Sequence, residues 1–329
     1  MTKKLINKCG VSLAFILLLI SCVYLDSVDY EVETEAGSTA VYTINCRIEP
    51  AESPSGEQLI IGFLVPNSWN ATEHTVVTYT SSQDVDVSGE QIAMPASLVP
   101  STEEPKNMTG RTWPQACMET YGVGPNVLEE MEWVCFKTDK AYDIQNGGNI
   151  LDLKVKLEVK VGMQNMRVRL GFLINNSGDG MSGDEARRGT FFTDCIDITN
   201  GNGAVIDFCE LHLNSVLPLF SNKDDILTIT YQGDVIENVL DDYDDLYLNA
   251  TAYTAEGNEY VVAEQSSKTS MKKLNDYSRN FSLTFWPTEF FNIPANEHVD
   301  EIRYVFTNAD GSVVLDDYGV PYSYVMSCE

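Results

Sequence analysis

Strict alternation between apolar and polar residues over positions 151–174 constrains the fold of this chain more than any other sequence feature. Side chains of a β-strand point alternately to its two faces, so apolar residues at every second position are typical of strands with one buried face. A short polar segment, Gly162–Asn165, divides the alternation into two runs and predicts a turn. We therefore expect an antiparallel hairpin whose buried side chains are Leu151, Leu153, Val155, Leu157, Val159, Val161, Met166, Val168, Leu170, Phe172 and Ile174.

Strand signals continue on both sides of this hairpin, and no helical periodicity of comparable length appears after residue 21. The run 58–65 is continuously apolar, which indicates a central strand buried on both faces. The fold class predicted is all-β with two domains, a β-sandwich over residues 39–215 and a smaller immunoglobulin-like β-sandwich over residues 216–329. The other expected strands are 41–48, 75–80, 131–137, 191–198, 205–211, 226–231, 246–253, 260–263, 281–285 and 302–306.

The amino terminus predicts export and lipid attachment. Three lysines precede an apolar segment at residues 11–20, which is too short to span a bilayer and has the layout of a secretory signal peptide. A leucine three positions before Cys22 and a serine directly before it fit a bacterial lipoprotein processing site. We expect a signal peptide over residues 1–21, lipidation of Cys22 and a flexible acidic tether over residues 22–38. The alternative is an ordinary signal peptide that happens to contain a cysteine.

The net charge restricts the class of partner. The formal charge is −28, and without residues 1–21, which hold three lysines and no acid, it is 18 − 49 = −31. Nucleic acids and anionic phospholipid surfaces need positive patches, so neither is expected as a partner. We interpret the acids as keeping an exported surface solvated. The basic residues on the exposed side of the predicted hairpin are likewise interpreted as a solvated face and not an anion site, namely Lys154, Lys156, Lys160, Arg167 and Arg169.

The polar loop after residue 174 offers candidate ligands for calcium. Asp179, Asp184 and Glu185 supply hard oxygen atoms on a glycine-containing loop, which suits this ion. Their spacing does not match the helix–loop–helix calcium motif. We interpret the segment as a surface loop and expect no cofactor, with calcium as the alternative.

Six cysteines follow Cys22, and two of them suggest a disulfide. Cys195 and Cys209 are equally distant from residue 202, the centre of the Gly201–Gly203 turn. A symmetric hairpin would place them directly opposite one another, within disulfide range, and an exported protein can oxidise them. The spacing of cysteines and histidines does not predict a zinc site. The remaining pairings stay open for Cys46, Cys117, Cys135 and Cys328.

Motifs of known enzyme classes are absent from the sequence. His74, His212 and His298 are isolated, and the chain contains no His-Glu-x-x-His, Gly-x-Ser-x-Gly or phosphate-binding glycine motif. A glycosidase needs only two carboxylates at a defined separation, which 49 acids could supply anywhere in the chain. We expect a non-catalytic protein, with a glycoside hydrolase as an alternative.

Aromatic residues in polar segments are candidates for sugar binding, because flat rings cover the apolar faces of pyranoses. Asn67, Asn70 and Gln115 accompany those of the first domain and could bond sugar hydroxyls. Packing in the core is the alternative for each ring, and it is the interpretation for Trp133. The candidates are Trp69, Trp113, Trp286, Tyr318, Tyr322 and Tyr324.

Several longer strings resemble a known family. These are FLVPNSWNATEHTVVTYTSS, YGVGPNVLEEMEWVCFKTDKAY and LGFLINNSGDG in the first domain and FFNIPANEHVDEIRYVFTNADGS in the second. They are similar to Bacteroidetes-type surface lipoproteins of unassigned function from polysaccharide-utilisation gene clusters. The C-terminal part also resembles domains of outer-membrane starch-binding lipoproteins.

This resemblance implies an accessory protein for glycan acquisition, lipid-anchored in the outer membrane and exposed at the cell surface. The implied partner is a polysaccharide or oligosaccharide, with outer-membrane uptake machinery as a further candidate. The alternative is a docking or structural lipoprotein without a sugar site. The family transfers no binding or catalytic residue to this chain.

Overall fold

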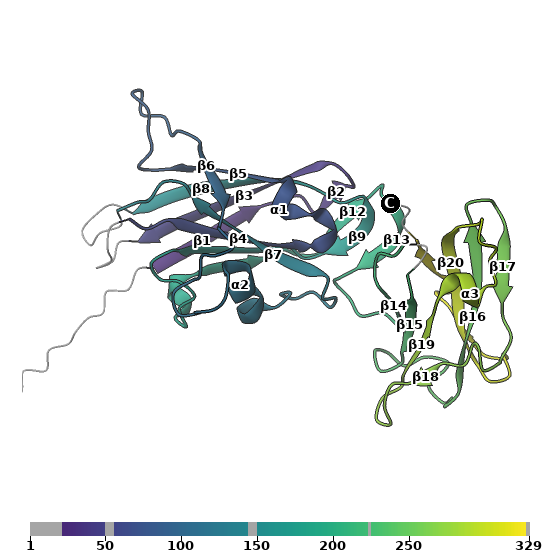
Figure 1. Ribbon diagram of the computed structural model, residues 1–329. Coiled ribbons are helices and arrows are strands. Elements are labelled where there is room, and N and C mark those ends of the chain that lie inside the picture. The colour runs from purple at the N-terminus through teal and green to yellow at the C-terminus, as the bar shows by residue number, and fades with distance from the viewer. Residues whose placement is uncertain (1–21, 50–55, 144–149, 223–224, 327–329) are drawn as a thin grey trace, which may run out of the picture.

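The computed structural model describes residues 22–49, 56–143, 150–222 and 225–326. Figure 1 shows two β-rich domains arranged end to end, which confirms the predicted all-β, two-domain fold. Each domain has its own hydrophobic core, the first built from residues 23–208 and the second from residues 216–326. In the described part of the chain, no helix has the length and apolar character needed to cross a membrane. The predicted signal peptide lies outside the described residues.

The first domain is organised by a large antiparallel sheet that folds over on itself to make a β-sandwich. Within the described residues its nine strands lie in the order β1 (Cys22–Asp29), β3 (Thr39–Glu49), β8 (Leu151–Lys160), β5 (Thr75–Ser81), β6 (Met94–Leu98), β7 (Met131–Thr138), β4 (Leu59–Pro66), β10 (Gly171–Asn176) and β11 (Gly189–Phe192).

Aromatic rings join the two layers of this sandwich. Tyr42 on β3 lies 5.7 Å from Phe63 on β4 and 5.6 Å from Phe172 on β10, measured between ring centroids. All eight residues of β4 are buried, which confirms the prediction of a central strand. Trp133 on β7 is buried as well, as predicted.

A second sheet covers the end of the sandwich that adjoins the C-terminal domain (Figure 1). Its order is β13 (Asn202–Asp207), β9 (Gln164–Val168), β12 (Ile196–Thr199) and β2 (Glu33–Glu35).

The two hairpins predicted from the sequence, one over residues 151–174 and one around the Gly201–Gly203 turn, are both wrong. β8 pairs with β3 and β5, whereas β9 belongs to the second sheet and β10 pairs with β4 and β11. β12 and β13 flank β9 on opposite sides and do not pair with one another.

The predicted tether over residues 22–38 is also wrong. β1 begins at Cys22 and pairs antiparallel with β3 from Cys22↔Glu49 to Asp29↔Thr43. Val23 and Val28 on this strand are buried in the core of the first domain, which offsets the entropy of ordering the segment. Asp26 and Asp29 on the same strand are exposed, so the strand was read as a polar linker.

The helices are short. α2 (Trp113–Tyr121) begins with a capping box, in which Thr112 accepts from the backbone N–H of Gln115 and the Gln115 side chain accepts from the backbone N–H of Thr112. This cap and Pro114 in the first turn start a helix within a long irregular connection. The other helical turns are η1 (Asn67–Trp69), α1 (Ala71–His74), η2 (Glu185–Arg187) and α3 (Pro287–Phe290).

The C-terminal domain is an immunoglobulin-like sandwich of two antiparallel sheets. One sheet has the order β14 (Asn214–Leu217), β15 (Leu227–Gln232), β19 (Asn280–Phe285) and β18 (Lys272–Lys273). The other has the order β17 (Glu259–Val262), β16 (Leu246–Thr254), β20 (Val299–Asn308) and β21 (Val314–Leu315), and β22 (Tyr322–Val325) also pairs with β20. The predicted boundary between residues 215 and 216 falls inside β14, whose four residues all pair with β15.

Candidate functional site

A groove of about 540 Å³ lies on the outer face of the C-terminal sheet formed by β17, β16, β20 and β22. We call it the β16–β20 groove. Its lining combines apolar and uncharged polar side chains with one acid and one base: Asn249, Ala250, Thr251, Tyr253, Val261, Ala263, Glu301, Arg303, Tyr304, Val305, Val320, Pro321 and Ser323.

The strand register brings the polar lining together. Leu248, Ala250 and Ala252 on β16 are buried in the sandwich, so the residues that alternate with them face outward. On β20 the partners of these outward residues also face out, as in the cross-strand pairs Asn249↔Val305, Thr251↔Arg303 and Tyr253↔Glu301. Ser323 on β22 is opposite Arg303, and Val261 on β17 is opposite Thr251.

An ion pair occupies one side of the groove. The Arg303 Nε and Nη2 atoms donate to the two carboxylate oxygens of Glu301, at 2.8 and 2.9 Å. The Ser323 hydroxyl donates to the same carboxylate at 2.6 Å, and the Arg303 guanidinium lies 4.8 Å from the centroid of the Tyr253 ring. The hydrogen bonds from Arg303, and secondarily that from Ser323, hold the pKa of Glu301 below its usual value.

Asn249 lines the groove and carries a hydrogen-bond acceptor without a partner. Its side-chain oxygen Oδ1 is buried and has no hydrogen-bond partner among the described residues. A buried amide oxygen without a partner is costly, which favours a rotation of the side chain that would bring the amide to a ligand hydroxyl or a bound water. Together, Asn249, Thr251 and Ser323 present uncharged polar groups beside the apolar surfaces of Val261 and Val305. This mixture suits a ligand with both C–H faces and hydroxyl groups.

The groove was not predicted from the sequence, because the pattern of residues along its strands indicates it only weakly. Alternation along residues 246–254 and 299–308 shows which side chains leave the core, but not that the two strands are neighbours. The close spacing of Glu301 and Arg303, two positions apart on a strand, was the available hint that they share a face.

The two tyrosines of β22 that were predicted to bind sugar point toward the core of the domain. Tyr322 and Tyr324 pair with Tyr304 and Ile302, and they point toward the core together with these partners. The Tyr322 ring packs on Tyr304 at 5.7 Å, and the Tyr324 hydroxyl donates to the backbone oxygen of Pro218. Ser323, which lies between them, is the residue of β22 that reaches the groove.

Trp69 and Trp113 are core residues of the first domain, so both were wrongly chosen as ligand-binding candidates. Trp69 in η1 and Trp113 in α2 are each 1% exposed, which leaves no ring face for a sugar. By contrast, Trp286 is 41% exposed at the start of α3, and Tyr318 is fully exposed in the turn before Val320. Trp286 does not line the β16–β20 groove.

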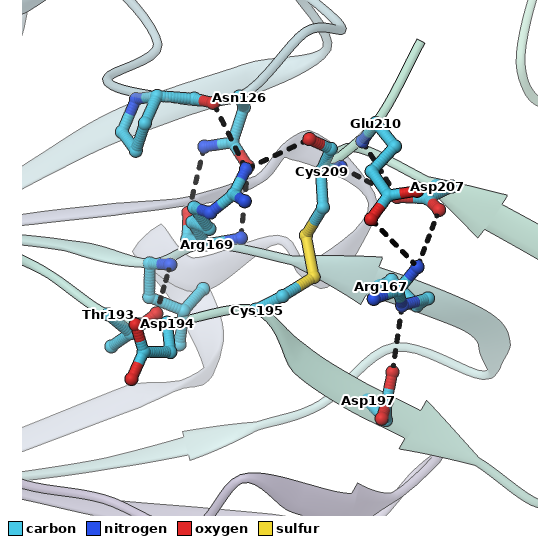
Figure 2. The surroundings of a disulfide bond; sticks show 12 residues. Asn126, Arg167, Arg169, Thr193, Asp194, Cys195, Asp197, Asp207, Cys209 and Glu210 are labelled. Carbon is cyan, nitrogen blue, oxygen red and sulfur yellow. Dashed lines mark hydrogen bonds and ion pairs between the residues drawn. A yellow bond between two sulfur atoms is a disulfide. The ribbon is translucent and has the colours of Figure 1, made fainter. Parts of the chain in front are cut away.

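The predicted disulfide between Cys195 and Cys209 is present, with 6.2 Å between the two Cα atoms. Figure 2 shows it beside two arginines that fix the same region. Arg169 Nη1 donates to the backbone oxygen of Cys209, and Arg167 bridges Asp197 and Asp207. The geometric reason differs from the predicted one, because the bond links segments on either side of β9 and not the two arms of a hairpin.

Two further interpretations concern charged residues of the first domain. The predicted basic stripe is divided, since Lys154, Lys156 and Lys160 lie on β8 whereas Arg167 and Arg169 lie near the disulfide. The one cluster of potential metal-ligand atoms in the described part of the chain is Cys195, Asp207 and Cys209. Its two sulfur atoms are already joined in the disulfide.

The candidate calcium loop contains its own cation. Arg187 Nη1 lies 3.2 Å from Asp179 Oδ1, and Arg187 Nε lies 3.7 Å from Asp184 Oδ2. Asp184 also caps η2 by accepting from the backbone N–H of Ala186, and Asp179 accepts from the side chain of Asn176. An arginine therefore supplies the positive charge beside both of these aspartates, and Glu185 lies on η2.

Comparison with known proteins gives family matches of undefined activity. One family model, Domain of unknown function (DUF4961), matches residues 23–212, and a second, Domain of unknown function (DUF8578), matches residues 214–315. The search of curated proteins found no match.

Several solved structures are distantly similar to the chain. The C-terminal domain of the Streptococcus pyogenes antigen I/II-family protein AspA is 11% identical, with 94% of this chain and all of that chain covered at a TM-score of 0.27. The Streptococcus agalactiae AgI/II polypeptide BspA C-terminal domain is 10% identical, with 94% and 99% covered at 0.25. AvmM, which catalyses macrocyclisation in alchivemycin A biosynthesis, is 7% identical, with 57% and 92% covered at 0.27.

These TM-scores are too low to support an argument about function. The family model over residues 23–212 matches more than half of the chain, and it fits a described β-sandwich with its own core. The protein therefore belongs to the family described as Domain of unknown function (DUF4961).

Proposed function

We propose that the protein is a non-catalytic, cell-surface lipoprotein that binds glycan in the β16–β20 groove as an accessory to polysaccharide uptake. The observation that carries this proposal is the lining of the groove, which places the Asn249 side chain and two hydroxyl groups beside an aromatic ring and valines. Sugars present hydroxyl groups at their edges and C–H groups on their faces, so this lining complements them.

The cellular location of the protein is part of the same proposal. Lipid attachment at Cys22 would anchor the chain at the start of β1, a strand in the part of the first domain that lies away from the C-terminal domain (Figure 1). The groove would then lie on the domain farther from an outer membrane, within reach of external polysaccharide and of uptake machinery.

The charged residues that line the groove disfavour a glycosidase active site there. Both mechanisms of glycoside hydrolysis use two carboxyl groups, one of which must be protonated to act as the acid. Glu301 is the one acid of the groove lining, and Arg303 keeps its pKa below the usual value. Glu301 is therefore ionised at neutral pH and has no partner acid across the groove.

The test is retention of the chain from residue 23 in native gels that contain polysaccharides, together with a glycan array. Asn249→Ala and Tyr253→Ala should each weaken retention, because they remove an acceptor and a ring from the groove. Trp286→Ala is the matched control, since it removes an exposed aromatic ring outside the groove. If the Trp286 variant loses binding and the groove variants keep it, the site is misplaced.

Docking of a protein partner is the second candidate function. Val261 and Val320 in the groove lining are 65% and 63% exposed, which is apolar surface that a protein could also cover. Absence of retention on every polysaccharide, combined with loss of a co-purifying envelope protein in a Val261→Asp variant, would favour docking over glycan binding.

A further inference from the structure

The two charged side chains of the β16–β20 groove neutralise one another. Among the groove-lining residues only Glu301 and Arg303 carry a charge, and they form two parallel hydrogen bonds of 2.8 and 2.9 Å. Such a bidentate arrangement fixes both the position and the direction of the guanidinium. The groove therefore presents no net charge to a ligand.

Contacts on both partners hold the pair in place. The Tyr253 ring lies against the Arg303 guanidinium, and the Ser323 hydroxyl donates to the Glu301 carboxylate at 2.6 Å. A carboxylate or sulfate group on a ligand could approach Arg303 only beside Glu301, at the cost of repulsion between like charges, or by displacing it. The remaining polar groups of the groove, on Asn249 and Thr251, are uncharged.

We propose that Glu301 is a specificity-determining residue that restricts the groove to uncharged glycans, by cancelling the charge of Arg303. This inference rests on the proposed glycan-binding function. The formal charge of −28 on the whole chain acts in the same direction, since it repels polyanions at low ionic strength. The ligand class is thus a glycan that carries hydroxyl groups and no uronic acid or sulfate.

The experiment compares uncharged with anionic polysaccharides in affinity gels. The probes are amylopectin, xyloglucan and galactomannan on one side, and polygalacturonate and dextran sulfate on the other. The wild-type chain from residue 23 should be retained by at least one uncharged polysaccharide and much more weakly by either polyanion. Glu301→Gln keeps the shape of the side chain and exposes the charge of Arg303, so retention on a polyanion should rise by roughly fivefold, the size expected of one partly exposed ion pair.

Two controls make the result specific. The gain should disappear at high salt, because a partly exposed charge is screened, and it should be absent from the double variant Glu301→Gln with Arg303→Gln. Thermal unfolding of each variant checks that the domain is folded, and Glu301→Ala makes the same charge change if Glu301→Gln does not fold.

The outcomes separate this inference from the proposed function. Wild-type retention on a polyanion as strong as on uncharged chains, or a Glu301→Gln variant without the gain, overturns the specificity role and leaves glycan binding standing. Absence of wild-type retention on all five probes and on the glycan array overturns the proposed function, and the inference falls with it.

Discussion

Cys195 and Cys209 are linked across β9, although the strands beside them, β12 and β13, each pair with β9 and not with one another. The two cysteines are 14 positions apart in the sequence, and the loop that the bond closes contains both strands. It also fixes Cys209 immediately before the segment that enters β14 of the C-terminal domain.

Loss of this disulfide should destabilise the first domain. Replacing both cysteines by serine should lower the free energy of unfolding by about 3 kcal/mol, the value expected for a loop of this length. The measurement is urea unfolding of wild type and variant without reductant. Adding reductant should lower the wild-type midpoint toward that of the variant, and an unchanged midpoint would contradict the stabilising role.

The loss of stability on replacing a tryptophan should depend on how deeply its ring is buried. Trp69→Ala and Trp113→Ala should each reduce the free energy of unfolding by about 3–5 kcal/mol, because both rings are 1% exposed. Trp286→Ala should change it by less than about 0.5 kcal/mol, since this ring lies at the surface. Denaturant unfolding followed by circular dichroism distinguishes the two classes. Equal effects at Trp69 and Trp286 would contradict the described packing.

Asp84 should make the free energy of unfolding depend on pH in the acidic range. Burial raises the pKa of this carboxyl, but hydrogen bonds from Lys140, Ser81 and Tyr142 outweigh it, so the folded-state pKa is below the usual value. A depressed folded-state pKa contributes stability above the unfolded-state value, about 3.9, and loses it as the pH falls through the folded-state value.

The variant Asp84→Asn should therefore cost roughly 1–3 kcal/mol at neutral pH. Its difference from wild type should shrink as the pH falls below the unfolded-state value of about 3.9, because the advantage of the wild-type anion is then lost. Urea titrations of both proteins across this range check the sign. A difference that grows on acidification would show that the aspartate is not stabilised as an anion.

The unpaired thiols of the first domain should be inert in the folded protein. Cys46, Cys117 and Cys135 are buried, and Cys117 Sγ lies 3.8 Å from Cys135 Sγ. Burial raises the pKa of Cys46, and the contact with Cys117, together with burial, raises that of Cys135. A thiol reagent should modify none of the three in the native chain from residue 23 carrying Cys328→Ser, and all three after denaturation. Rapid labelling of the native protein would contradict this burial.

The sequence predicts strands better than it predicts their partners. Alternation identified the buried face of β8 correctly, because a period of two depends only on which side of a strand meets the core. The partner of a strand depends on the path of the chain between strands. The segment Gly162–Asn165 was therefore read as a hairpin turn, although it passes from one sheet to the other.

The candidate site was predicted poorly for a related reason. Trp69 and Trp113 lie in polar segments, yet both side chains turn into the core. Tyr322 and Tyr324 were predicted as ligand-binding candidates, whereas the register of β22 turns them toward the core and Ser323 toward the groove. The β16–β20 groove forms where outward residues of four strands meet, and no single stretch of sequence contains that surface.

The pairing of β1 with β3 from Cys22 onward has a mechanical consequence. A force that pulls Cys22 away from the C-terminal domain acts along β1, parallel to the strand axis (Figure 1). The seven residue pairs between β1 and β3 would then be loaded together in shear, and not opened one after another from an end. If the chain is tethered at this residue, drag on a captured ligand would be transmitted through a ladder that must break as a unit before the first domain begins to unravel.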